Sequence, residues 1–277
     1  MGLDRRQMAT DSSFPQSIEA SVPERSHSET TEKAHGTSLI DFLESLLVTI
    51  LLVLFGTTFV VQAFKIPSQS MEPTLLVGDH LLVNKFIFEG SGAWYEKLLP
   101  YRPVRRGDII VFRFPYDDHA HYVKRVIGLP GDRIRIIDQQ LSINESTVPE
   151  AYAYHDLTAY DPLSENFPPA GHFAAMGLRP EWAGQIKNYV HDGELVVPPN
   201  HYFVMGDNRN SSLDSRYWGF VDRRAIIGRP ILVYWSVRAT AGDYADRSLL
   251  GSLRGISGAL FHLPSETRWH RMLRFVR

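Results

Sequence analysis

Two serines stand close together between two prolines near residue 70. The segment 67–75 has the sequence Pro-Ser-Gln-Ser-Met-Glu-Pro-Thr-Leu, with its serines at Ser68 and Ser70. The prolines restrict the backbone on both sides, which suits a nucleophile that must be held in one position. A serine between prolines is far more often an ordinary loop residue, so a nucleophile also requires a base. No G-x-S-x-G segment is present, and no histidine has the sequence context of a triad base.

A lysine can supply that base if burial keeps its amine neutral. Desolvation lowers the pKa of a lysine from ~10.4 towards neutrality, and the neutral amine can then accept a serine proton. Lys124 lies in the strand-like run 121–128. Alternation places it on one face with Tyr122 and Val126, whereas Arg125 falls on the opposite face. Lys124 can therefore be buried, although the spacing alone favours an ordinary edge-strand lysine with its ammonium in water.

Composition excludes several other chemistries. The chain has no cysteine, so disulfides, thiolate metal sites and a cysteine nucleophile are excluded. His119 and His121, with Asp117 and Asp118, could suggest a metal site, but an H-x-H pair in such a loop is more often solvated, and no metal is expected. The formal net charge of -2 over 277 residues does not suggest a nucleic-acid partner.

The N-terminal part of the chain combines a polar tail with a long apolar run. Residues 1–38 are rich in Ser, Thr, Glu and His and have no sustained apolar period, so we expect a disordered tail. The run 45–63 is apolar apart from hydroxyls and Gln62, and about 20 such residues suffice to cross a bilayer as a helix. The alternatives are a fully buried core helix and a cleavable secretory signal, and the long polar tail argues against the second. Flanking basic residues leave the orientation open.

Beyond the apolar run, the sequence is typical of a mostly β fold. Short β-branched and aromatic runs alternate with turn residues at 79–89, 107–115, 121–128, 133–138, 140–144, 193–205 and 225–237. Residues 148–192 show little periodicity and predict a long excursion from the sheet. The apolar segment 247–263 is short and broken by Arg254, so we do not expect a second membrane span there.

Four segments, in this order, resemble the type I signal peptidase family. They are the serine segment at 67–75, Arg-Gly-Asp-Ile-Ile-Val-Phe at 106–112, Tyr-Val-Lys-Arg-Val-Ile-Gly-Leu-Pro-Gly-Asp at 122–132, and Met-Gly-Asp-Asn-Arg-Asn-Ser-Ser-Leu-Asp-Ser-Arg-Tyr-Trp-Gly at 205–219. The resemblance covers most of the chain from 39 to 237 but not 148–192. The sequence departs from the family at Gln69, where Gly is frequent, and at Asn144-Glu145, where an Asn-Gly turn is frequent.

The resemblance implies a domain organisation. We expect a mostly β, signal-peptidase-like catalytic domain over 64–240, which includes an inserted β-rich subdomain at 133–195 and is preceded by one transmembrane helix. The transmembrane anchor is expected at 39–63, with 1–38 as a cytoplasmic tail and 241–277 as a basic C-terminal segment. The chain would then be a single-pass protein of the inner (cytoplasmic) membrane, with its catalytic domain on the extracytoplasmic side.

The resemblance also implies the catalytic roles. Ser70 would be the nucleophile, and Lys124 would act first as general base and then as general acid. The backbone N–H of Ser70 and the hydroxyl of Ser68 would form an oxyanion hole. Ser212 would form a hydrogen bond with Lys124 and orient it.

Further residues would support the site or line it. By resemblance, a charged set would brace the catalytic residues, and a plain charged turn is the alternative; the set is Asp207, Arg209, Asp214 and Arg216. A second, apolar set would line shallow pockets that accept small residues such as Ala before the scissile bond, and plain core packing is the alternative; these residues are Ile66, Met71, Leu75, Tyr122 and Val123.

Together these expectations describe a membrane-anchored serine endopeptidase. It would remove signal peptides from secreted precursors after Ala-x-Ala-like sites, with secretory preproteins and membrane lipid as partners and with no cofactor or metal. The main alternative is a non-catalytic, membrane-anchored β module that binds secreted chains. A Ser-Lys self-cleaving regulator would require a DNA-binding module, and the polar tail at 1–38 is too short and irregular to be one.

Overall fold

The computed structural model of the chain describes residues 39–56, 61–88, 101–156, 158–169, 171, 176–238 and 265–276. The predicted tail at 1–38 and the segment 247–263 lie outside these residues. The boundary between the two compact units of the chain falls between Leu47 and Val48.

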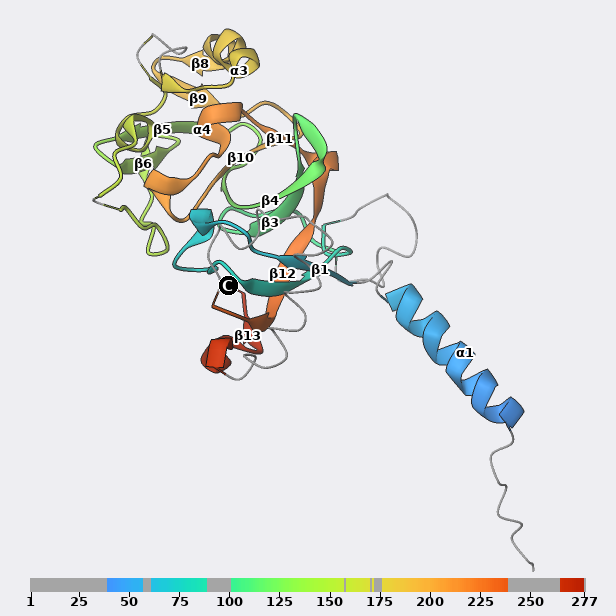
Figure 1. Ribbon diagram of the computed structural model, residues 1–277. Helices are drawn as coiled ribbons and strands as arrows, with labels where there is room; N and C mark the ends of the chain where they lie inside the picture. Colours follow the sequence, from blue (N-terminus) through green and yellow to red (C-terminus); the bar gives the residue numbers. More distant parts are fainter. Residues whose placement is uncertain are drawn as a thin grey trace, which may run out of the picture. The chain divides into compact units, whose positions relative to one another are not determined.

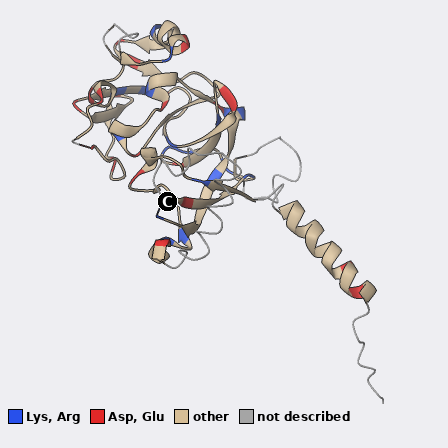
Figure 2. Cartoon of the chain, viewed as in Figure 1, with Lys and Arg blue, Asp and Glu red and all other residues tan. Residues whose placement is uncertain are grey.

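Helix α1 (Leu39–Phe55) is apolar along most of its length. Its acidic residues, Asp41 and Glu44, lie near its start (Figure 2). Its large apolar side chains are exposed. Within the described part of the chain, no helix combines the length and the hydropathy needed to cross a membrane. The predicted anchor at 39–63 also extended too far, because Val61–Lys65 form strand β1. Because β1 contains apolar residues like those of α1, the end of the helix cannot be recognised from the composition.

The larger sheet has eight antiparallel strands (Figure 1). Its spatial order is β1-β2-β12-β3-β4-β10-β11, and β13 pairs with β12. The strands are β1, β2 (Asp79–Asn84), β3 (Ile109–Phe114), β4 (Asp117–Gly128), β10 (His201–Met205), β11 (Val221–Asp222), β12 (Ile226–Ser236) and β13 (Arg274–Phe275). Short helical turns connect them: η2 (Gln69–Met71), η6 (Arg209–Ser211), α4 (Ser215–Trp218), η7 (Arg223–Ala225) and η9 (Trp269–Arg271).

A smaller sheet of five strands, in the order β7-β6-β5-β9-β8, is inserted between β4 and β10. Its strands are β5 (Arg133–Ile137), β6 (Gln140–Ile143), β7 (Ser146–Thr147), β8 (Val190–His191) and β9 (Glu194–Val196). The excursion between β7 and β8 contains α2 (Pro162–Glu165), α3 (Pro180–Gln185) and η5 (Ile186–Asn188). The prediction of a mostly β fold is therefore confirmed, and a second sheet occupies the region of the expected subdomain.

Two details of the strand prediction differ from the structure. The predicted run 193–205 is two strands, β9 and β10, which belong to different sheets. The turn between β6 and β7 keeps a hairpin form although it lacks glycine: Asn144 and Glu145 have φ values of 51° and 66°. Asn144 tolerates this left-handed region, and its side-chain oxygen accepts a hydrogen bond from the Arg133 N–H at 2.9 Å. The departure from the Asn-Gly turn thus leaves the hairpin intact.

The core of the larger sheet reaches the serine segment. Ile66, Met71 and Leu75 are buried in one apolar cluster with residues of β2, β3 and β12. Because these side chains are on both sides of Ser70 in sequence, packing fixes the segment that carries it. The β sheet therefore acts as the platform on which the serine segment is positioned.

Candidate active site

Ser70 lies in η2, which follows β1 after a short extended stretch. The backbone before it is tied to β2, because the Ile66 N–H donates to the Asp79 carbonyl at 2.9 Å. Its own carbonyl accepts a hydrogen bond from the Asn208 N–H at 3.1 Å. Ser70 is 7% exposed and lines a pocket. These contacts hold the Ser70 hydroxyl in one place, with limited access from solvent.

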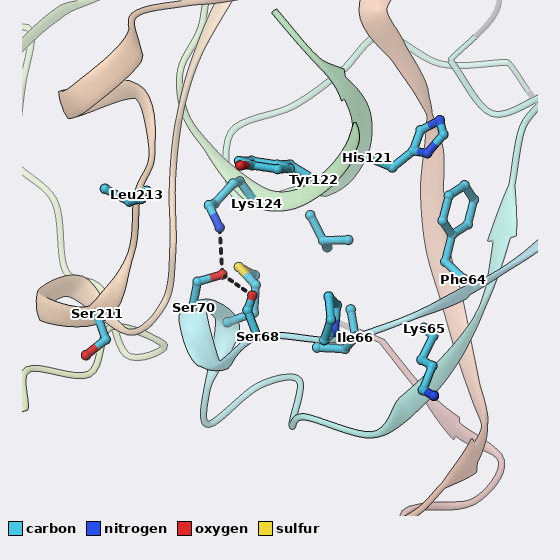
Figure 3. A pocket seen from close by; sticks show the side chains of 13 residues that line it. Phe64, Lys65, Ile66, Ser68, Ser70, His121, Tyr122, Lys124, Ser211 and Leu213 are labelled. Carbon is cyan, nitrogen blue, oxygen red and sulfur yellow. Dashed lines mark hydrogen bonds between the residues drawn. The ribbon is translucent and has the colours of Figure 1, made fainter. Parts of the chain in front are cut away.

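Lys124 reaches Ser70 from strand β4. Its Nζ donates a hydrogen bond to Ser70 Oγ at 2.6 Å (Figure 3). Lys124 is 4% exposed, as the alternation of its strand allowed. Burial removes its ammonium from water, and this lowers the pKa of Lys124 from 10.5 to about 8. The alternative, a lysine on an edge strand with its ammonium in water, is therefore wrong for Lys124.

Three charged side chains act on the Lys124 amine from a distance. Burial has the largest effect on the pKa of Lys124; after it, Asp214 raises this pKa, Arg216 lowers it and Asp207 raises it. Because these charges oppose one another, burial decides the direction of the shift. A neutral fraction of the amine is present at neutral pH, and it grows as the pH rises through about 8.

Ser68 lies beside the nucleophile. Its Oγ is 3.4 Å from Ser70 Oγ, and both hydroxyls face the same pocket (Figure 3). Ser68 is exposed, so its hydroxyl can rotate towards a bound group. The structure thus contains a second hydroxyl beside the nucleophile, and its role in an oxyanion hole stays a prediction.

Ser212 does not form the expected hydrogen bond with Lys124. Its Oγ is buried and forms no hydrogen bond of good geometry among the described residues, but it lies near the Asp214 carboxylate and helps to lower the pKa of that group. The Lys124 amine is directed at Ser70 Oγ instead. Ser212 packs against Gly206, where an added Cβ would lie 2.3 Å from Ser212 Oγ and 2.4 Å from the Ser70 carbonyl oxygen. Glycine at position 206 therefore allows the two serine-bearing segments to approach each other.

Asp207 joins all four motif segments behind the dyad. Its carboxylate accepts hydrogen bonds from Arg125 Nε at 2.8 Å, from Arg125 Nη2 at 2.6 Å and from the Thr74 hydroxyl at 2.6 Å. Arg125 Nη1 also donates to the Gly107 carbonyl at 2.8 Å. Each of these four residues comes from a different motif segment. A buried ion pair with satisfied hydrogen bonds is consistent with the supporting role predicted for Asp207.

Asp214 and Arg216 form a second buried pair. Arg216 Nε and Nη2 each donate to the Asp214 carboxylate at 2.8 Å. Arg216 Nη1 donates to Ser164 Oγ at 2.6 Å and to Asp161 Oδ2 at 3.2 Å. Burial by itself raises the pKa of Asp214, but the Arg216 guanidinium and the Gly206 N–H outweigh it and keep this pKa below its usual value. Both groups of the pair are therefore charged at neutral pH.

Arg209 pairs with Glu150, which the sequence analysis missed. Arg209 Nη1 and Nη2 both donate to the Glu150 carboxylate at 2.6 Å, and Arg209 Nε donates to the Gly206 carbonyl at 3.1 Å. Glu150 and Asp161 belong to the excursion for which no role was predicted. Two buried arginines in one motif require carboxylate partners, so the presence of Arg209 and Arg216 was the only indication in the sequence that such partners exist. The partners are 59 and 55 positions away, so no local pattern identifies them.

The pocket at the dyad has a volume of about 330 Å³. Ile66, Met71, Tyr122 and Val123 line it, as predicted from the resemblance. Leu75 does not line it; it is 1% exposed and belongs to the core cluster under the serine segment, which corrects that prediction. The lining residues that the sequence analysis missed are Phe64, Lys65, Pro67, His121, Ser211 and Leu213.

Two strands border this pocket. Among the described strands, β1 pairs only with β2. In β4, residues 121–124 pair with β3 on one side, and β10 pairs with β4 only from Arg125 onwards. The rings of Phe64 on β1 and His121 on β4 meet edge to face with centroids 5.5 Å apart, so the two strands face each other across the pocket (Figure 3).

Residues 265–276, which belong to the predicted basic C-terminal segment 241–277, make buried contacts with the larger sheet. Arg271 is 4% exposed, and its Nη2 donates to the buried Asp79 carboxylate at 2.6 Å and to the Thr74 carbonyl at 3.0 Å. The Ser236 hydroxyl donates to Asp79 at 2.6 Å. The C-terminal segment thus connects the serine segment to the sheet.

His121 lines the pocket at the dyad. The described residues contain no group of three potential metal ligands among His, Cys, Asp and Glu.

Comparison with known proteins identifies relatives of this chain. The sequence profile described as "Signal peptidase, peptidase S26" matches residues 39–235. Signal peptidase I of Pseudomonas aeruginosa is 34% identical over 72% of this chain and 73% of its own length. Signal peptidase I of Aquifex aeolicus is 32% identical over 78% of this chain and 92% of its own length. A solved signal peptidase I from Enterococcus faecalis is 31% identical and covers 46% of this chain and 97% of its own, with a TM-score of 0.31.

The extent of these matches decides the family. The profile covers well over half of the chain and includes all four motif segments. The chain belongs to the signal peptidase family, peptidase S26, and is a serine endopeptidase of that family. The resemblance found in the sequence is therefore confirmed.

Proposed function

We propose that this chain removes signal peptides from secreted precursors through an acyl-enzyme formed on Ser70 with Lys124 as the base. The observation that carries the proposal is the 2.6 Å contact between Ser70 Oγ and the buried Lys124 amine, whose pKa is lowered to about 8. A neutral amine at this distance can take the Ser70 proton directly. The name shared by the relatives, signal peptidase I, supports the substrate class.

The mechanism has two halves that use the same lysine. In the first, Ser70 Oγ attacks the scissile carbonyl carbon while Lys124 Nζ accepts the hydroxyl proton. The carbon–nitrogen bond then breaks, and the Lys124 ammonium gives its proton to the leaving amine, which leaves an ester on Ser70. In the second half, Lys124 accepts a proton from the attacking water, and Ser70 Oγ leaves and recovers a proton from Lys124. No other acid or base is required.

The developing oxyanion would be stabilised by two donors of the serine segment. These are the backbone N–H of Ser70 and the hydroxyl of Ser68, which lies 3.4 Å from Ser70 Oγ. A donor aimed at this oxygen typically contributes about 3 kcal/mol to the transition state. The packing of Ile66 and Met71 in the core supports this role, because preorganised donors need no rearrangement during the reaction.

An extended substrate fits between the facing edges of β1 and β4. Each edge offers backbone donors and acceptors, so a peptide between them can add one strand to both. The side chains of such a strand would alternate between the pocket and the solvent. Apolar side chains from Ile66, Met71, Tyr122 and Val123 would then limit the room beside the scissile bond, which favours small residues such as Ala. This supports an Ala-x-Ala-like preference.

We also propose that the chain is held at the inner membrane by its N-terminal helix, with the catalytic unit on the extracytoplasmic side. The exposed apolar side chains of α1 support contact with lipid. Its 17 residues correspond to about 25 Å of helix, against about 30 Å for a hydrocarbon core. The orientation rests on the resemblance to the family, whose substrates are secreted precursors.

The test is cleavage of a purified secretory precursor with an Ala-x-Ala site by the full-length protein in detergent. Wild type should cut after this site, as read by the mass of the product, and Ser70→Ala and Lys124→Ala should not. Lys187→Ala serves as the matched control, because Lys187 is exposed and lies in η5. Normal cleavage by either dyad variant would contradict the mechanism. Binding of the precursor by wild type without cleavage would favour the non-catalytic β module.

A further inference from the structure

A second pocket adjoins the one that contains the dyad. It has a volume of about 600 Å³ and is lined by basic and apolar side chains, among them Arg113, Arg223, Arg224 and Phe88. We call it the basic pocket. His121 lines both pockets, so the two are neighbouring hollows along strand β4. No role in the proposed mechanism uses the basic pocket.

Within the part of the chain that the structure describes, the guanidinium groups of the basic pocket have no carboxylate partners. Arg113, Arg223 and Arg224 make no ion pair with any described residue, whereas the arginines behind the dyad are all paired. The guanidinium of Arg113 donates to the Arg224 carbonyl at 3.1 Å. Asp222, which precedes these arginines in sequence, accepts a hydrogen bond from the Arg224 N–H at 2.7 Å. In a chain whose formal net charge is -2, three unpaired arginines around one pocket favour an anionic ligand.

Residues along strand β1 line one pocket after the other. Gln62 lines the basic pocket, and Phe64 and Ile66 line the pocket at the dyad. Residues two apart in a strand face the same side, so these three positions form one row. From Ile66 to Gln62 the row is about 13 Å long, at about 3.3 Å per residue. A peptide that adds to the edge of β1 would follow this row from the dyad to the basic pocket.

We propose that the basic pocket binds an acidic side chain of the substrate, located at the fourth to sixth residue before the scissile bond. The inference deepens the proposed function and rests on it, because it uses the substrate path between β1 and β4. If the residue before the scissile bond lies beside Ile66, the residue four positions earlier lies beside Gln62. A Glu side chain and the long arginine side chains extend the reach by about one residue in each direction.

The strength of charge-assisted hydrogen bonds in a solvent-accessible pocket determines how strongly Glu is preferred over Gln. Such bonds are stronger than neutral ones, but solvent and salt screen them. We expect wild type to cleave a substrate with Glu at the matching position about fivefold to tenfold more efficiently, in kcat/KM, than one with Gln. Raising the salt from 50 mM to 500 mM should reduce this ratio, because the pocket is open to solvent.

The test uses the full-length protein in detergent and pairs of precursor peptides that share one Ala-x-Ala site. Each pair carries Glu or Gln at one position, from the fourth to the seventh residue before the scissile bond. In the double variant Arg113→Glu/Arg224→Glu, both substituted side chains are exposed, and the Glu-to-Gln ratio should fall below one. Arg135→Glu is the matched control: Arg135 is an exposed arginine on β5, away from the basic pocket, and its ratio should equal that of wild type.

The outcomes separate this inference from the proposed function. A ratio near one at every position, with Gln peptides cleaved normally by wild type, overturns the basic pocket as a substrate site and leaves the peptidase proposal standing. No cleavage of any peptide overturns both. If phosphatidylglycerol vesicles raise the cleavage of Glu and Gln peptides equally in wild type but not in the double variant, the pocket binds a lipid headgroup and the proposal is wrong.

Discussion

The catalytic dyad and the arginines behind it differ in how their buried positive charge is compensated. Lys124 is buried without an ion-pair partner among the described residues, and its pKa falls to about 8. Arg209 and Arg216 are at least as deeply buried, yet each forms a bidentate pair with a carboxylate. Without a carboxylate partner, the buried Lys124 amine readily gives up its proton. The buried guanidinium groups of Arg209 and Arg216 stay charged, and their carboxylate partners hold them in place. The comparison can be tested by removing each kind of cation.

The largest change in stability should follow removal of a matched cation. Arg216→Met leaves Asp214 and Asp161 buried without their partner, and loss of one member of a buried pair typically costs about 3–5 kcal/mol. We expect the free energy of unfolding, measured by urea titration, to fall by this amount. Arg135→Met, at an exposed site, should change it by less than about 0.5 kcal/mol. A loss below about 1 kcal/mol in Arg216→Met would contradict the role of these buried pairs.

Removal of the unmatched cation should stabilise the protein. The folded pKa of Lys124, about 8, lies below its unfolded value of 10.5, so protonation favours the unfolded chain. The resulting cost is fully present below pH 8 and disappears as the pH rises through 10.5. Lys124→Met keeps a similar shape without the charge and should raise the free energy of unfolding by about 2–3 kcal/mol at pH 7.

Two further readouts belong to the same variant. The gain in stability should shrink between pH 8 and pH 10.5, when urea unfolding of wild type and Lys124→Met is compared across this range. Cleavage by Lys124→Met should be reduced by at least about 10³-fold, because no other base is in place. A destabilised Lys124→Met at pH 7 would show that the ammonium has a partner in the folded protein.

A smaller loss should follow neutralisation of a partner in the excursion. Glu150→Gln keeps the shape of the side chain but removes the charge that pairs with Arg209. Hydrogen bonds to a charged group contribute about 1.5–3 kcal/mol, and the amide retains part of this, so we expect a loss of about 1–2 kcal/mol in urea unfolding. The exposed Glu145→Gln, in the β6–β7 turn, is the matched control. Equal stability of the two variants would mean that the excursion does not support the motif.

The smallest effect should come from Ser212. Its buried hydroxyl forms no hydrogen bond of good geometry among the described residues, and its interaction with the Asp214 carboxylate is the smallest of those that lower the pKa of that group, so it contributes little to folding. Ser212→Ala should therefore leave the free energy of unfolding within about 1 kcal/mol of wild type, or raise it slightly. A loss clearly above that value would indicate that Ser212 is hydrogen bonded in solution, as its predicted contact with Lys124 requires.

The sequence predicted the parts of the site that depend on local patterns. Alternation along 121–128 allowed Lys124 to be buried, and the four motif segments identified the family. Patterns of this kind extend over a few residues, so they also located most strands of the larger sheet. The acceptors Glu150 and Asp161 could not be found in this way, because they pair with arginines 59 and 55 positions away from a segment without periodicity.

Two other features were hidden for physical reasons. Strand β1 follows an apolar helix and is itself largely apolar, so composition alone extended the predicted anchor to Ala63. Arg271 lies in the predicted basic C-terminal segment, but its burial against Asp79 could not be predicted, because this partner is 192 positions away. Leu75 was assigned to the pocket by resemblance but is a core residue. The sequence does not show which apolar side chains of a segment face the core and which face the pocket.

The central claim is that a buried, neutral Lys124 activates Ser70, and the pH dependence of kcat/KM tests it most directly. The measurement uses the full-length protein in detergent, one precursor with an Ala-x-Ala site, and pH values from 6 to 10. Because the neutral amine is the active form, kcat/KM should rise with pH, with a midpoint near 8, and then level off. A profile that is flat over this range, or one that falls above pH 7, would contradict the account.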